Sequence, residues 1–316
     1  KLYISIDYDC REAARQVAAG AYSRGAAFVD VGYTDSFLHA EAIRAGKSSV
    51  EFPEYLKMNM TETSSPGWKY IGVFSGIEPD IYEDLPSDTA AEYFKGYGAL
   101  RALKRKPIMN GDIPWSLTYL PSKDMAAKSY PGLSVEAALE NYWGHVISIM
   151  HLDEADPVGF WNSRMEKAAG RSRFMTGLGA DFLHFEGPGT DLKVGLNKNA
   201  EWEGGFKESG TGESYLSNIP TDEIFTSPDW RTAEGKVSLT KPFVMHQNLG
   251  PVPVNAWFEF REGRVTDYGA ESGKESLDAL FARDERARYL GEAALVDPRS
   301  PFAEAGIIFY NGLYDE

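Results

Sequence analysis

The sequence lacks several features that would place a protein in a class at once. It has a single cysteine, Cys10, so no disulfide can form within the chain. No apolar run approaches the roughly 20 residues that a membrane-spanning helix needs. Basic residues are scarce, since 32 Lys and Arg stand against 47 Asp and Glu, giving a net charge of −15. Nucleic acids and anionic membranes bind basic surfaces, so we expect neither as a partner.

The common catalytic motifs are also missing from the sequence, which contains no Walker loop, GxSxG, HExxH or CxxC. Serine hydrolases, phosphate-loop enzymes and cysteine-bound zinc sites therefore lose their strongest sequence support. The histidines show no metal-ligand spacing, and each is expected to be structural or at the surface: His39, His145, His151, His184 and His246. Carboxylates remain as candidate ligands, because divalent metal ions accept Asp and Glu oxygens.

The hydrophobic pattern that is present predicts an α/β protein with two domains. Strands are expected at 2–7, 27–33, 68–76 and 114–121, with helices at 11–26, 88–106, 133–152 and 156–179. The first strand, helix and strand form a βαβ unit, so the first sheet should be partly parallel. From residue 181 the chain becomes strand-rich and mostly antiparallel in character, with a helix from 274 and closing strands at 292–296 and 306–311.

We place the domain boundary at residue 177, where two glycines end the preceding helix. This gives an N-terminal α/β domain at 1–177 and a mixed, strand-rich α/β domain at 178–316. The chain opens inside a strand pattern and closes directly after another, so we expect it to be a fragment that is incomplete at its C-terminal end. The cytoplasm is the expected compartment, given one cysteine and no visible signal peptide.

Two carboxylates stand out by their context. Glu223 lies between Pro220 and an apolar Ile-Phe pair, and Glu292 opens the apolar segment EAALV. Acids at strand ends can converge in a cleft and bridge a pair of metal ions, although most are solvated. Periodicity alone therefore favours solvated carboxylates over metal ligands at Glu223 and Glu292.

Five blocks of the second half stand out, in chain order GPGTDLKVGL, SNIPTDEIFTSPDW, EGRVTDYGAESGKESLDALF, ARYLGEAALV and GIIFYNGLYDE. Together they resemble the thermophilic metallo-aminopeptidases of the aminopeptidase T and aminopeptidase S type. The resemblance covers residues 180–316 well and the first domain mainly through its opening βαβ unit.

The resemblance implies an aminopeptidase in which two divalent ions, zinc, cobalt or manganese, activate a water that hydrolyses the N-terminal residue of a peptide. It carries the role of metal ligand to Glu223 and Glu292, makes Asp222 an outer or solvated neighbour, and implies a homodimer. The family's remaining His and Asp ligands and its catalytic Tyr follow the LYDE motif, where this sequence stops. A protein that ended at this point would therefore be expected to be inactive. No residue of this sequence is assigned a catalytic role. The alternative is a non-catalytic protein of this fold that binds peptides or small molecules.

Overall fold

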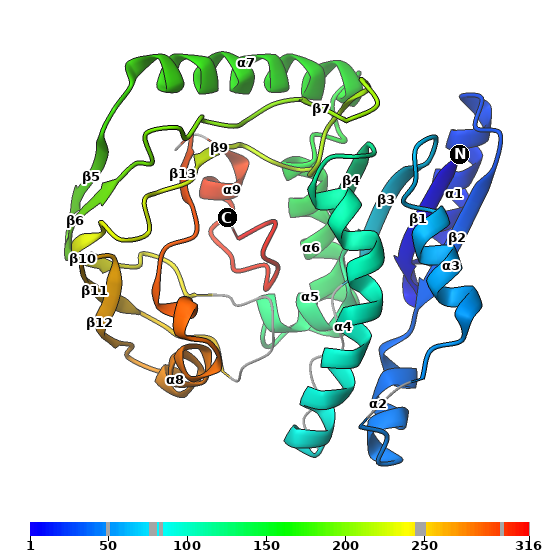
Figure 1. The fold of residues 1–316 in the computed structure, drawn as a ribbon, viewed down its shortest axis with the longest axis horizontal. Helices are drawn as coiled ribbons and strands as arrows, with labels where there is room; N and C mark the ends of the chain where they lie inside the picture. The colour runs from blue at the N-terminus through cyan, green and yellow to red at the C-terminus, as the bar shows by residue number, and fades with distance from the viewer. Residues whose placement is uncertain (49–50, 76–80, 82–84, 244–250, 298–299, 316) are drawn as a thin grey trace. The chain divides into compact units, whose positions relative to one another are not determined.

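The computed structural model of the 316-residue chain describes residues 1–48, 51–75, 81, 85–243, 251–297 and 300–315. It divides into two compact units (Figure 1). Unit 1 comprises residues 1–146 and 206–220, and unit 2 comprises 147–205 and 221–316. The boundary expected at residue 177 lies at the end of a helix inside unit 2, and a domain division at that point stays a prediction.

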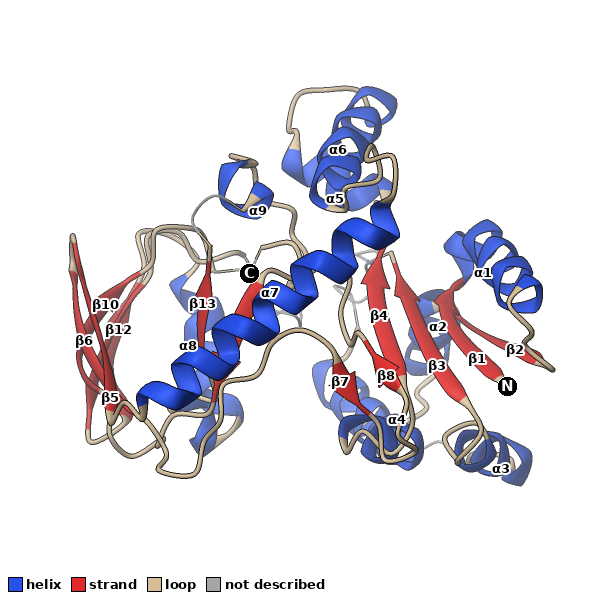
Figure 2. Cartoon of the chain, turned by 90° about the horizontal axis from the view of Figure 1, so that it is seen from above, coloured by secondary structure: helices blue, strands red, loops and turns tan. Residues whose placement is uncertain are grey.

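Unit 1 is built on a parallel sheet with the strand order β2-β1-β3-β4. Its strands are β1 (Leu2–Asp7), β2 (Val29–Thr34), β3 (Lys69–Phe74) and β4 (Trp115–Tyr119). Figure 2 shows α1 (Arg11–Ser23) over one face of the sheet and α4 (Ser87–Met109) over the other. The residues of β1 divide accordingly, because Leu2, Ile4 and Ile6 pack with α1 while Tyr3 packs with Ile108 of α4. The expected βαβ unit is confirmed.

Shorter elements complete unit 1. They are η1 (Tyr8–Cys10), α2 (Ser36–Arg44), α3 (Glu54–Glu62), α5 (Lys123–Ser129), α6 (Val135–Ile149) and the hairpin of β7 (Lys207–Glu208) with β8 (Ser214–Tyr215). The last residues of α6 belong to unit 2. Throughout the described part of the chain, no helix combines the length and the apolar character that crossing a membrane requires.

Unit 2 contains the antiparallel sheet that the sequence predicted, with the order β12-β11-β10-β6-β5. Its strands are β5 (Phe182–Gly187), β6 (Thr190–Gly195), β10 (Glu234–Ser238), β11 (Trp257–Arg261) and β12 (Arg264–Gly269). Helix α8 (Lys274–Arg283) packs on this sheet through Leu277 and Phe281, which lie in one core with Phe258 and Val265. The element η3 (Glu285–Arg288) follows α8.

The rest of unit 2 surrounds a second strand pair, formed by β9 (Glu223–Thr226) and β13 (Ala293–Val296). The long helix α7 (Pro157–Leu178) begins as predicted at Asp156, whose carboxylate accepts a hydrogen bond of 2.9 Å from the Gly159 amide. A short helix, α9 (Pro301–Glu304), comes after β13.

The strand expected at 306–311 is wrong. The segment forms bends and turns, because the Asp315 carboxylate accepts hydrogen bonds of 2.8 Å from the backbone amides of Phe309 and Asn311. Tyr310 between them has a φ of 53°, in the left-handed region, which ends any extended run. The apolar residues of this segment are therefore buried in a loop that the Asp315 side chain holds in place, and not in a β-strand.

Lys104 of α4 is an unusual member of the unit 1 core. It is only 7% exposed, and its Nζ lies 3.0 Å from the centroid of the Tyr3 ring without a hydrogen-bond partner among the described residues. Burial lowers the pKa of this amine from its ordinary 10.5 to about 7, although the Asp30 carboxylate acts in the opposite direction. The charged form of Lys104 therefore destabilises the folded state near neutral pH.

We predict that Lys104→Met stabilises the protein at pH 7 and below. Below pH 7 the Lys104 amine is protonated in both the folded and the unfolded state. Between pH 7 and 10.5 it is neutral in the folded state but still protonated in the unfolded state. The free energy of unfolding of the wild type should consequently rise with pH by up to about 1.4 kcal/mol per unit. Urea unfolding at several pH values measures this rise, which the variant should lack. Lys106→Met, at an exposed position of α4, is the control and should keep the wild-type profile; identical profiles for all three proteins would contradict the prediction.

Candidate functional site

The strand pair β9–β13 carries both carboxylates that the sequence singled out. The strands are antiparallel, with Glu223 opposite Val296 and Thr226 opposite Ala293. Glu223 is half-buried as the first residue of β9, and Glu292 is exposed directly before β13. The same strand pair therefore carries both glutamates, although 69 positions separate Glu223 from Glu292 in the sequence.

The two carboxylates lie at opposite ends of the strand pair. Ile224 and Thr226 are buried, so Glu223 points to the opposite, less buried face of β9. Glu292 lies directly before Ala293, which is paired with Thr226 at the other end of β9. The strand pair therefore holds the two glutamates at separate positions.

A third carboxylate, Glu203, was not indicated by the sequence. It belongs to a segment that pairs with β9 along the edge opposite β13. The backbone of Glu203 exchanges hydrogen bonds of 2.7 and 2.9 Å with Phe225, and residues paired in this way present their side chains to the same face. Glu203 is exposed, whereas its neighbour Trp202 is buried against Ile224 and Ala168. No local sequence pattern links this segment to β9, and only the fold brings the two together.

The opposite face of the β9 start holds a buried ion pair. Asp222, 5% exposed, accepts hydrogen bonds from Nε and Nη2 of Arg164 in α7 and from the hydroxyl of Ser300, which is fully buried. The Arg164 side chain is 24% exposed. Asp222 was expected as an outer or solvated neighbour of a metal site; the structure excludes solvation, because its carboxylate is enclosed by these donors.

Aromatic residues support Arg164. Its guanidinium carbon lies 5.9 Å from the centroid of the Phe160 ring, and the His151 ring stacks on Phe160 with centroids 3.8 Å apart. Burial lowers the pKa of His151, and the positive charge of Arg164 lowers it further. A neutral imidazole beside Phe160 avoids placing a second cation next to the guanidinium.

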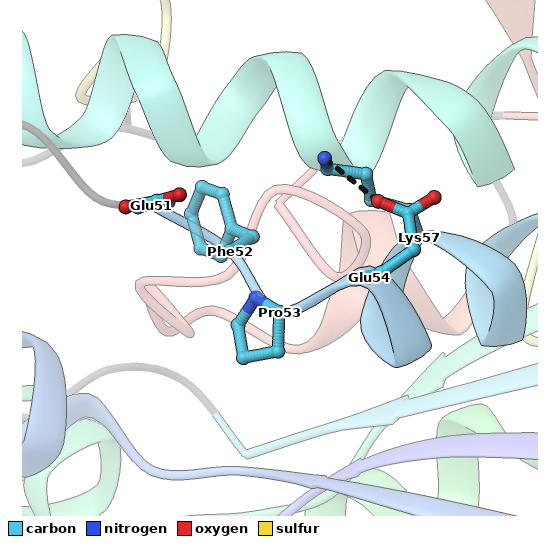
Figure 3. A pocket seen from close by; sticks show the side chains of 5 residues that line it. All are labelled: Glu51, Phe52, Pro53, Glu54 and Lys57. Carbon is cyan, nitrogen blue, oxygen red and sulfur yellow. Dashed lines mark hydrogen bonds and ion pairs between the residues drawn. The ribbon is translucent and has the colours of Figure 1, made fainter.

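The remaining histidines are dispersed. His39 lies 2.9 Å from the Tyr93 hydroxyl, His184 lies 2.8 Å from Asp191, and His145 stacks on Tyr130. His246 lies outside the described residues. A pocket of about 580 Å³ is lined in unit 1 by Glu51, Phe52, Pro53, Glu54 and Lys57, with Lys57 paired to Glu54 at 3.1 Å (Figure 3). It contains neither Glu223 nor Glu292.

Comparison with known proteins identifies the family. The sequence model of a family described as thermophilic metalloprotease (M29) matches residues 1–316. The chain is 33% identical to aminopeptidase PepS of Streptococcus thermophilus, over 99% of this chain and 76% of that protein. It is 30% identical to aminopeptidase T of Thermus aquaticus, over 96% of this chain and 74% of that protein. The chain belongs to the M29 family.

The fold agrees with this membership. The structure of wild-type AmpT from Thermus thermophilus matches with a TM-score of 0.89 and 27% identity, covering 100% of this chain and 77% of that one. The match confirms the predicted mixed α/β fold, with its parallel and antiparallel sheets. The similarity extends over unit 1 as well, although the sequence resemblance was quoted mainly from the second half.

M29 membership implies a divalent metal, and the carboxylates of the β9–β13 pair suit one chemically. Carboxylate oxygens are ligands for zinc, manganese and cobalt, and Glu223 is half-buried while Glu292 is exposed. Among the residues that the structure describes, no group of three or more His, Cys, Asp or Glu is placed to hold a metal ion. The two glutamates can therefore supply part of a ligand set.

We predict that Gly205→Ala destabilises unit 2 by at least about 2 kcal/mol. Gly205 has a φ of 89°, and a methyl group there would lie 2.5 Å from the Met165 carbonyl oxygen and 3.0 Å from the Ala169 side chain. The change should push the Glu203 segment off α7. Gly170→Ala, inside α7 with nothing within 4 Å, is the control and should be neutral or stabilise by up to about 1 kcal/mol. Equal thermal unfolding midpoints for the two variants would refute the prediction.

Proposed function

We propose that this M29 protein is a metal-dependent aminopeptidase that hydrolyses the N-terminal residue of peptides, with Glu223 and Glu292 among its metal ligands. One structural observation supports the assignment of residues. One strand pair carries both glutamates, with Glu223 as the first residue of β9 and Glu292 directly before β13, in a chain that the family model matches over residues 1–316. Relatives that match nearly all of the chain carry the name aminopeptidase.

The chemistry follows from the positions of the acids. When bound, two divalent ions would activate a water as the nucleophile and polarise the carbonyl of the bond to be cleaved. Glu223, half-buried at the start of β9, would hold its oxygens in a fixed direction, while the exposed Glu292 would approach from the other end of the pair. The net charge of −15 suits a substrate that presents a free amino group.

The finer points of the proposal concern metals, compartment and assembly. We propose zinc, cobalt or manganese as the pair of ions, since carboxylate donors accept all three. The cytoplasm remains the proposed compartment, supported by a single cysteine, Cys10, whose thiol is buried. A homodimer is proposed from the family resemblance. Peptides with a free N-terminus are the proposed substrates.

We predict that Glu223→Gln in the full-length protein abolishes turnover and leaves the fold intact. Glutamine keeps the shape of the side chain and removes the charge that a dication requires. The loss of kcat/KM should exceed the roughly 10- to 100-fold that removal of an outer partner of a metal ligand costs. Glu166→Gln, at an exposed position of α7, is the charge-matched control and should retain wild-type turnover of an amino-acid p-nitroanilide. Unchanged turnover in Glu223→Gln would remove Glu223 from the site.

We also predict that a chelator abolishes peptide hydrolysis and that zinc, cobalt or manganese restores it. The reason is that carboxylate ligands alone supply neither the nucleophile nor the electrophile. The measurement is hydrolysis of a short peptide before chelation, after it and after addition of each metal. Binding of an amine ligand that persists in chelator, without hydrolysis under any condition, would instead favour the non-catalytic binding protein.

A further inference from the structure

We propose that the Arg164–Asp222 ion pair is the positioning device for Glu223, so that both residues set the affinity of the proposed metal centre without touching the metal. This inference rests on the proposed role of Glu223. It assigns a function to a buried charge pair that fold stability alone does not require, because buried ion pairs can often be replaced by apolar residues without loss of stability.

Backbone continuity makes the connection direct. Asp222 immediately precedes Glu223, and successive side chains of an extended chain point to opposite faces. Fixing the Asp222 carboxylate on the α7 side therefore fixes Glu223 on the open side. Both carboxylate oxygens of Asp222 are held by the forked guanidinium of Arg164, a geometry that restricts orientation as well as distance.

Ser300 extends the restraint to the partner strand. Its hydroxyl donates to Asp222, and it is the N-cap residue of α9, which follows β13 closely in the chain. Val296, the last residue of β13, is the residue opposite Glu223. The Ser300 hydroxyl thus links Asp222 to the N-terminus of α9, at the end of the strand pair where Glu223 lies.

The anchor lies on a helix that also packs against β9. Arg164 lies one helical turn before Ala168, and Ala168 packs in one core with Ile224 and Trp202. Arg164 and Ala168 of α7 therefore contact Asp222 and Ile224, the two residues that flank Glu223. A ligand carboxylate supported in this way keeps its direction when no metal is bound, which lowers the cost of binding one.

The test measures the affinity of the full-length protein for cobalt or zinc alone by isothermal titration calorimetry, at a temperature well below the unfolding midpoint. Arg164→Lys keeps the positive charge but loses the paired hydrogen bonds of the guanidinium to Asp222, and Arg164→Met loses both the charge and the hydrogen bonds. We expect about tenfold weaker metal binding for Arg164→Lys and a larger loss for Arg164→Met, in the range that outer partners of metal ligands show. Lys167→Met, at an exposed position of α7, is the matched control and should bind as the wild type does.

Circular dichroism separates positioning from folding. If Arg164→Met does not fold, Arg164→Lys and Ser300→Ala carry the test, since each leaves Asp222 at least one partner. Folded Arg164 variants with wild-type metal affinity would overturn the proposal, because a purely structural pair lowers only the unfolding midpoint.

Glu223→Gln separates this inference from the proposed function. Wild-type metal affinity in Glu223→Gln would show that Glu223 is no ligand, and both proposals would fail. Loss of affinity in Glu223→Gln together with unchanged affinity in the Arg164 variants would defeat the positioning role alone. If Arg164 acts through Glu223, Arg164→Lys should weaken binding less in the Glu223→Gln background than in the wild type.

Discussion

The carboxylate of Asp222 is the constraint on which the arrangement of unit 2 depends. An ionised carboxylate that is 5% exposed has to be surrounded by donors, and no single element provides them. Arg164 comes from α7 and Ser300 from the N-cap of α9, so the charge can be satisfied only when helix, strand and loop assemble together. This coupling makes assembly around β9 specific, whereas apolar contacts alone would tolerate sliding.

Asp222 and Glu223 show how neighbouring acids acquire opposite roles. The pleat turns Asp222 into the protein, where protein donors satisfy it, and turns Glu223 outwards to the less buried face. The Asp222 carboxylate pairs with Arg164 of the same chain, and Glu223 lies on the face of β9 that Glu203 also shares through its pairing with Phe225. An Asp-Glu pair beside an apolar run therefore encodes an anchor and a candidate ligand in two consecutive residues.

Much of the fold could be predicted from the sequence because its signals are local. The strand and helix of the first βαβ unit, the N-cap Asp156 and the hairpin between β5 and β6 all lie in short windows whose periodicity or turn chemistry specifies them. The short helices α2, α3 and α5 were missed, since fewer than three turns give little periodic signal. The strand expected at 306–311 failed because Asp315, outside that window, captures its amides.

The candidate site was harder to predict from the sequence, because residues far apart in the chain form it. The family resemblance supplied Glu223 and Glu292, but neither Arg164 nor Glu203 has a local pattern that links it to β9. The register of β9 and β13 keeps Glu223 on the less buried face of β9, and a slip by one residue would turn it to the core side. That register is held by Ile224 and Leu295, which pair across the strands and pack together beneath α7. The apolar core thus determines which face of β9 Glu223 occupies, and the buried Arg164–Asp222 pair adjoins Glu223 at the start of the strand.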